Sequence, residues 1–133
     1  MNFEIQVLLI AELVGTAYYR MLQRRACDPI LDQVCARILS DEAQHVAFHL
    51  ARLRDIHATL LPAERALWSL QFQVLFSAAL FVAWVDHRAA LGAIGTRRVE
   101  FYEEARKECI GFLDALAAGL TTGATAPVLS LPT

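Results

Sequence analysis

Three ionisable residues stand where the sequence should carry core hydrophobes. In segment 29–58 an apolar series with steps of three or four residues runs from Leu31 to Ile56, and Glu42, His45 and His49 occupy three of its positions. A buried, unpaired carboxylate costs several kcal/mol, so these groups need partners or a metal ion. Carboxylate and imidazole ligands suit iron or manganese, and the sequence does not choose between the two metals.

A further carboxylate, Glu12, lies in the apolar stripe of the preceding segment. With the turn between the two segments centred near Cys27, Glu12 lies fifteen residues before the turn and Glu42 fifteen residues after it. At 1.5 Å per residue both are about 22 Å from the turn, at one level of a helical hairpin, with His45 one turn beyond. A carboxylate facing a Glu-x-x-His pair is half of the four-Glu, two-His site that holds two metal ions in helical bundles.

The elements that position these residues read as helices throughout. Most of the four Pro and six Gly residues separate long segments with a 3.6-residue hydrophobic period. We predict helices at about 2–25, 29–58, 62–90 and 97–118 in a single domain over 1–120, and a loose tail over 121–133. Asp28 and Pro29 mark the start of the second helix, and Thr96 is expected to cap the fourth. Short connections predict an all-α, up-down four-helix bundle.

Composition narrows the possible classes of protein. The 133 residues fit one domain, and 56% of them are hydrophobic, which excludes disorder. A net charge of -2 lacks the basic excess that binds nucleic acid. The three cysteines form no CxxC pair, so we expect reduced thiols and a cytoplasmic protein. The N-terminus lacks the basic segment of a signal peptide, and none is expected.

The metal-ligand pattern resembles a known group of proteins. Glu12 together with the run Asp41-Glu42-Ala43-Gln44-His45 is similar to one half of the ferritin-like di-metal carboxylate superfamily, which includes ferritins, rubrerythrins, fatty-acyl desaturases, ribonucleotide reductase small subunits and arylamine N-oxygenases. The run 41–48 is most similar to the second Glu-x-x-His helix of the N-oxygenases. The resemblance covers about residues 3–57, under half of the chain.

The resemblance implies a di-iron or di-manganese centre, with oxygen-dependent oxidoreductase or ferroxidase chemistry and no organic cofactor. Glu12 would be a terminal ligand, Glu42 a bridging ligand and His45 a terminal imidazole ligand. Two further side chains, His49 and Tyr19, would lie behind the ligands and tune or shield the metal.

The chain departs from the family pattern because it carries only half of a site. Segments 62–90 and 97–118 contain no second Glu-x-x-His. A homodimer or a larger even-numbered oligomer would supply the missing half, since a two-fold axis brings the same residues of two subunits together. Two alternatives stay open: a metal-free helical interaction module, and the incomplete C-terminal half of a longer ferritin-like enzyme.

Two other segments need separate interpretations. Residues 66–85 carry no charge over twenty positions, a membrane-spanning length, but Ser69, Gln71, Gln73 and Ser77 favour burial between chains over membrane association. In the fourth segment, Glu104 and Glu108 share or border the apolar stripe. Completion of the metal shell by these two carboxylates is the less favoured interpretation.

Overall fold

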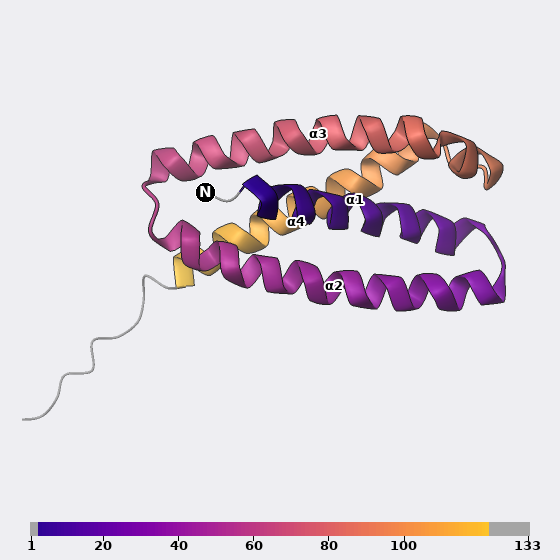
Figure 1. Ribbon diagram of the computed structural model, residues 1–133, viewed down its shortest axis with the longest axis horizontal. Helices are drawn as coiled ribbons and strands as arrows, with labels where there is room; N and C mark the ends of the chain where they lie inside the picture. Colours follow the sequence, from indigo (N-terminus) through magenta and orange to yellow (C-terminus); the bar gives the residue numbers. More distant parts are fainter. Residues whose placement is uncertain (1–2, 123–133) are drawn as a thin grey trace, which may run out of the picture.

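The computed structural model describes residues 3–122 and consists of four helices (Figure 1). They are α1 (Phe3–Arg25), α2 (Pro29–Ala58), α3 (Pro62–Ala93) and α4 (Arg98–Thr122). The predicted all-α architecture is confirmed, because the described residues contain four helices and no strand. Helices α3 and α4 each end a few residues later than their hydrophobic periods indicated. The predicted tail lies outside the described residues from position 123 onward.

Local chemistry at the chain turns explains where the helices begin. The Asp28 carboxylate accepts hydrogen bonds from the backbone N–H groups of Ile30 and Leu31, at 2.8 and 3.1 Å, and Pro29 occupies the first helical position. The preceding residue, Cys27, has a φ of 49°, so the α1–α2 turn uses a left-handed conformation. At the start of α3, the Glu64 carboxylate accepts a 2.7 Å bond from the Leu61 N–H.

The expected cap at Thr96 is wrong. Its hydroxyl is buried without a hydrogen-bond partner among the described residues. The free N–H of Arg97 instead donates to the Glu100 carboxylate at 2.8 Å, and Gly95 turns the chain with a φ of 74°. A carboxylate one turn inside the helix therefore replaces the hydroxyl, and it also complements the positive end of the helix dipole.

The hydrophobic core lies between α1, α3 and α4. Its largest fully buried side chains include Leu9 and Leu13 of α1, Trp68 and Phe72 of α3, and Phe101 of α4. Figure 1 shows α1 between α2 and α3, and α1 packs against all three other helices. The stacked rings of Trp68 and Phe72, with centroids 5.1 Å apart, form the aromatic centre of this core.

Helix α2 contributes little to this core. Within Pro29–Ala58, all of which the structure describes, the buried residues are Cys35, Leu53 and His57. The long central stretch 36–52 therefore has no buried residue, and it carries two of the three candidate metal ligands, Glu42 and His45. Near its C-terminal end α2 is held against α4 by Arg54, whose guanidinium donates to the Ala115 carbonyl at 2.8 Å.

Helices α1 and α3 have the length and apolar composition of membrane-spanning segments. Half of the most apolar window of α1 is buried inside the bundle, which is typical of a core helix. The corresponding window of α3 is only 22% buried. Its exposed apolar side chains recur every three to seven residues on the side opposite the core: Leu67, Leu70, Val74, Phe81 and Val85.

Candidate metal centre

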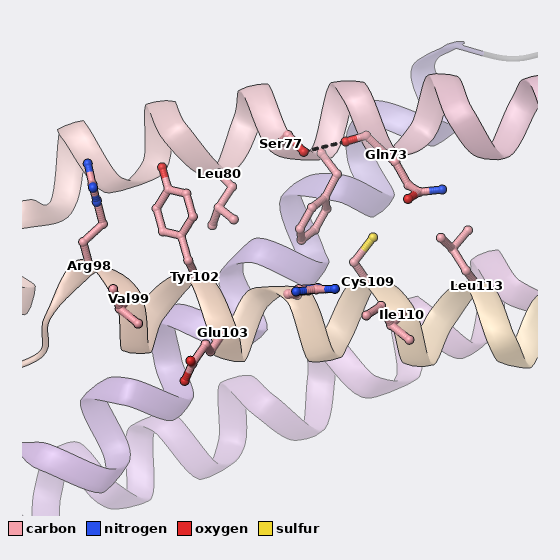
Figure 2. Close-up of a pocket in the computed structure, with 12 residues that line it drawn as sticks. Gln73, Ser77, Leu80, Arg98, Val99, Tyr102, Glu103, Cys109, Ile110 and Leu113 are labelled. Atoms are coloured by element: carbon pink, nitrogen blue, oxygen red, sulfur yellow. Dashed lines mark hydrogen bonds between the residues drawn. The ribbon is translucent and has the colours of Figure 1, made fainter.

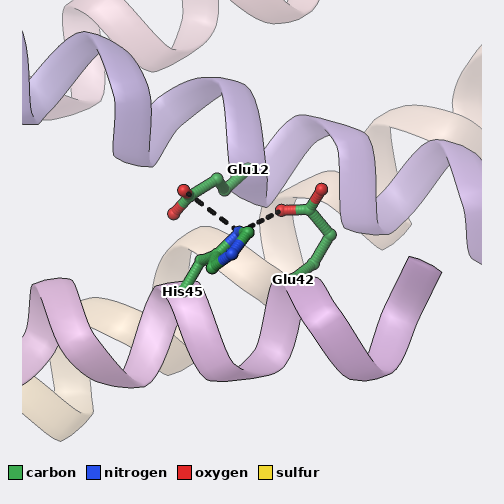
Figure 3. Close-up of side chains that lie close together, drawn as sticks. All are labelled: Glu12, Glu42 and His45. Atoms are coloured by element: carbon green, nitrogen blue, oxygen red, sulfur yellow. Dashed lines mark ion pairs between the residues drawn. The ribbon is translucent and has the colours of Figure 1, made fainter. Parts of the chain in front are cut away.

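The structure brings Glu12, Glu42 and His45 together between α1 and α2 (Figure 3). One ligand atom from each residue lies within 4.8 Å of the other two. His45 Nδ1 is 3.7 Å from Glu12 Oε1 and 3.9 Å from Glu42 Oε2. Two atoms that bind one ion at about 2.1 Å each lie at most about 4 Å apart, so small rotamer changes would place all three on one ion.

The oxygens of the two carboxylates lack the partners that buried charges require. Glu12 Oε2 and Glu42 Oε2 are both buried and accept no hydrogen bond among the described residues. Their side chains are 17% and 22% exposed, whereas the His45 side chain is 59% exposed on the open side of the cluster. This donor set fits a divalent cation, because a cation would neutralise both carboxylates and accept the imidazole nitrogen as a third ligand.

The electrostatics of the cluster point in the same direction. Burial raises the pKa of the Glu42 carboxyl above its usual value, and the nearby Glu12 carboxylate raises it further. His45 lowers the pKa of Glu42, whereas Asp41 raises it. The two carboxylates repel each other in a partly desolvated site. A bound cation would offset this repulsion and favour the ionised form of both groups.

Of the two residues expected behind the ligands, His49 approaches the cluster. Its Nε2 lies 3.4 Å from Glu12 Oε1, while its Nδ1 is buried without a partner among the described residues. The second residue, Tyr19, packs edge-on against Tyr18, with ring centroids 5.3 Å apart. Within residues 3–122, no hydrogen bond joins Tyr19 to a ligand.

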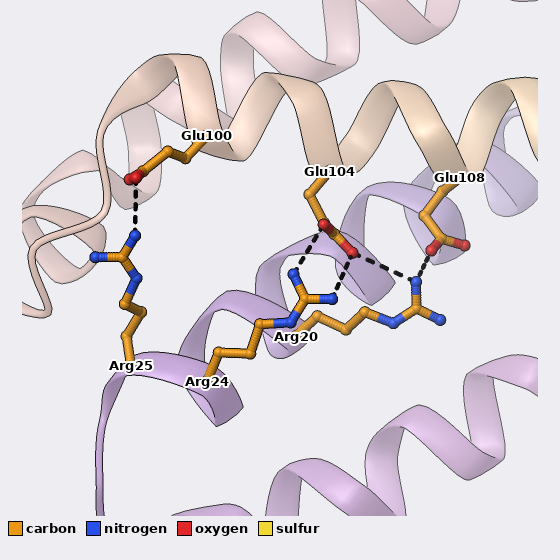
Figure 4. A network of polar contacts seen from close by, with 6 residues as sticks. All are labelled: Arg20, Arg24, Arg25, Glu100, Glu104 and Glu108. Atoms are coloured by element: carbon orange, nitrogen blue, oxygen red, sulfur yellow. Dashed lines mark hydrogen bonds and ion pairs between the residues drawn. The ribbon is translucent and has the colours of Figure 1, made fainter.

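The carboxylates of α4 are held by arginines instead of joining the metal ligands (Figure 4). Arg24 donates to both oxygens of Glu104, at 3.0 and 3.3 Å. Arg20 pairs with Glu108 and lies 3.5 Å from Glu104. The Glu104 side chain is only 6% exposed, so these ion pairs neutralise a buried charge. A second set of metal ligands is therefore not supplied by α4.

The pair Asp86 and His87 also lies outside the cluster. The ring of His87 packs edge-on against Tyr18 at 4.7 Å, and its Nδ1 lies 3.1 Å from the Ala83 carbonyl. The sequence pattern does not indicate this contact between α1 and α3. Tyr18 and His87 lie on different helices, and no periodic pattern in either segment indicates that their rings pack together.

A separate groove of about 600 Å³ lies between α3 and α4 (Figure 2). It is lined by Gln73, Leu80, Tyr102 and Cys109 among others. Burial raises the pKa of the Cys109 thiol to about 11, so the thiol is neutral at physiological pH and a poor nucleophile. Arg98, Glu103 and Arg106 also line the groove and place charged groups on its α4 side.

No family model, curated protein or solved structure matches this chain. The ligand geometry, burial and charge of the cluster are therefore the observations that bear on its chemistry.

Proposed function

We propose that this chain is a ferritin-like carboxylate protein in which two copies assemble a centre for two iron or manganese ions. The observation that carries the proposal is the cluster of Glu12, Glu42 and His45, whose ligand atoms lie within 4.8 Å of one another. One buried oxygen of each carboxylate, Glu12 Oε2 and Glu42 Oε2, has no hydrogen-bond partner among the described residues, and this supports the proposal further. Two such clusters provide the four carboxylates and two imidazoles of a carboxylate-bridged di-metal site.

The reaction class we propose is an oxygen-dependent oxidation, either of a substrate or of ferrous iron itself. When bound, the metal pair supplies the redox chemistry with dioxygen. Glu12, Glu42 and His45 of each chain would hold the ions, with Glu42 as the bridging ligand and Glu12 and His45 as terminal ligands. His49 holds the Glu12 carboxylate in place across the α1–α2 contact, where its Nε2 is 3.4 Å from Glu12 Oε1.

The direct test is metal stoichiometry under anaerobic conditions. We expect the parent protein to bind two ferrous or manganous ions per dimer, so one per chain. At 100 times the dissociation constant, binding stabilises the fold by about 2.7 kcal/mol. For a domain of this size the melting temperature should rise by about 10 °C.

Two variants make this test specific. Glu42→Ala removes the bridging carboxylate and should abolish both the stoichiometric binding and the thermal shift. Glu108→Gln removes a carboxylate of similar exposure that is paired with Arg20, and it should bind metal as the parent does. Equal metal uptake by the parent and Glu42→Ala, with melting temperatures independent of metal, would rule out the di-metal function.

One observation favours a second candidate, a metal-free helical interaction module. The apolar stripe of α3, which includes Leu67, Val74 and Phe81, is exposed along the helix. Such a stripe is typical of a surface that another protein covers. A parent protein that binds no metal but forms a stable complex through α3 would favour this module.

A further inference from the structure

The outer face of α1 carries apolar and small residues around the candidate metal ligand Glu12. Leu8 and Ala11 are exposed and Gly15 is partly exposed. Their spacing places them on one side of the helix, with Glu12 at its edge. Between positions 5 and 19, Glu12 is the only charged residue. This face therefore offers a surface for close apolar contact, and it borders the ligand cluster of Glu12, Glu42 and His45 directly.

Gly15 is not explained by the fold of a single chain. Glycine in the middle of a helix lowers helix stability relative to alanine. Gly111 on α4 has equally open space, so Gly15 is distinguished by its place one turn from Glu12. A Cβ added at Gly15 would meet nothing within 4 Å, and Gly15 has no left-handed φ. The bare backbone at this position leaves room for a helix from outside the chain, one turn from Glu12.

On one side of this face, helix α2 leaves the ligand cluster exposed to solvent. The His45 side chain is 59% exposed, although it lies 3.7 Å from Glu12. Phe48, three residues further along α2, is 63% exposed. Next to these exposed rings, one buried oxygen each of Glu12 and Glu42 accepts no hydrogen bond among the described residues. This side of the ligand cluster is therefore uncovered in the single chain.

On the other side of the face lies a groove of about 490 Å³ between α1 and α3. Its walls combine small residues, Ala11 and Gly15 on α1 and Ala79 and Ala83 on α3, with larger side chains and one acid: Val82, Tyr18, Tyr19, Asp86 and His87. Small side chains let a neighbouring helix approach the backbone closely. The apolar surface therefore continues from the metal cluster across α1 to α3.

We propose that this face of α1, defined by Leu8, Ala11 and Gly15 and continued by the groove to Val82, is the docking surface for a second copy of this chain. The inference rests on the proposed function, because the ligands that the half-site lacks are the same Glu, Glu and His that a second copy carries. A two-fold axis beside Glu12 brings the two half-sites together and packs the two α1 faces against each other. Residues 5–19 of α1 carry no charge other than Glu12, which suits contact of this helix face with the same face of a second copy.

The test places a large side chain at Gly15. Gly15→Trp fills space that is empty in the single chain, so the chain should fold while the close approach of the second copy is blocked. Gly111→Trp is the matched control, because Gly111 is an exposed helical glycine on α4 with equally open space. Molecular mass by light scattering, helix content by circular dichroism and manganese stoichiometry are measured for each variant.

We expect a dimer for the parent and for Gly111→Trp, and a folded monomer with at least tenfold weaker manganese binding for Gly15→Trp. Should the Trp variant lose helix content, Gly15→Gln provides the same test with a flexible polar side chain. The proposed docking surface is overturned if Gly15→Trp stays dimeric, if both variants become monomeric, or if the parent is monomeric with and without manganese.

These outcomes separate the surface from the function. If the parent and Gly15→Trp bind one manganese ion per chain equally well, the di-metal site does not depend on this surface. If the parent is a dimer that Gly15→Trp dissociates, yet binds no metal, the surface stands and the proposed function fails. A monomeric parent that sediments with phospholipid vesicles would assign the apolar face to a membrane and overturn the second-copy proposal.

Discussion

The Nε2 atom of His49 lies 3.4 Å from Oε1 of Glu12, across the contact between α2 and α1. The His49 side chain is largely buried, whereas His45 on the same helix is mostly exposed. This relationship gives the two histidines different parts in the candidate site: His45 offers its nitrogen toward both carboxylates, and His49 restrains one of them from behind.

The first prediction concerns this restraint. Replacing His49 by Leu fills a largely buried position with an apolar side chain and removes the imidazole beside Glu12. Loss of a group that orients a metal ligand weakens metal binding. We expect about 10–100-fold weaker binding for His49→Leu. Anaerobic titration with ferrous iron measures it. His87→Leu, which changes a histidine packed on Tyr18, should bind iron as the parent does.

The second prediction concerns the metal-free protein. Because burial and Glu12 raise the pKa of Glu42, its ionised form is less favourable in the folded than in the unfolded chain, and this stability cost is complete above the folded pKa. Glu42→Gln should therefore unfold at a higher urea concentration than the parent at pH 7 in the presence of a chelator. A lower midpoint for Glu42→Gln would indicate that the charged carboxylate stabilises the fold without metal.

The third prediction is a pH dependence at the other end of α2. Burial, and then the Arg65 guanidinium, lower the pKa of His57 from 6.5, and the His57 ring packs edge-on against Trp68 at 4.5 Å. The unfolded chain therefore binds the proton more tightly, so the stability that neutral His57 contributes is present above about pH 6.5 and is lost as the pH falls below it.

His57→Phe tests this prediction because phenylalanine keeps the ring but does not titrate. The urea midpoint should fall less between pH 7.5 and pH 5 for His57→Phe than for the parent. Carboxylates elsewhere in the chain titrate alike in both proteins, so the difference between the two slopes reports on His57. Parallel slopes would show that His57 does not control the acid sensitivity.

The fourth prediction concerns the buried carboxylate of α4. Glu104 is neutralised by Arg24 and Arg20, and removing both arginines would leave a buried charge without a partner. The double variant Arg20→Met/Arg24→Met should lose about 3 kcal/mol of unfolding free energy. Adding Glu104→Leu to this double variant should restore part of the loss, as measured by urea unfolding. A triple variant less stable than the double variant would contradict the ion-pair explanation.

The fifth prediction concerns the start of α2. The Asp28 carboxylate satisfies two backbone N–H groups that have no partner inside the helix. Asp28→Ala should reduce the unfolding free energy by about 1 kcal/mol, and Asp28→Ser should restore most of it. Thermal unfolding measures both effects. No change for Asp28→Ala would mean that the first turn of α2 does not contribute to global stability.

The amino-acid sequence by itself determined the helical architecture and the level of the candidate ligands. Hydrophobic periods and Pro–Gly punctuation are local signals, so they placed four helices and the cap at Asp28. The equal spacing of Glu12 and Glu42 from the turn near Cys27 is also local, because a helix has a fixed rise per residue. A hairpin of two helices then brings these side chains to the same level.

Only the tertiary structure decided how the charged groups pair and which faces stay open. The pairing of Glu104 with Arg24 joins residues 80 positions apart, and the contact of Tyr18 with His87 joins α1 to α3. The exposure of His45 and the empty space at Gly15 depend on where α2 and α3 lie around α1. Such relationships arise from packing between helices, whose rotation and distance are set by many side chains together and leave no periodic trace in any one segment.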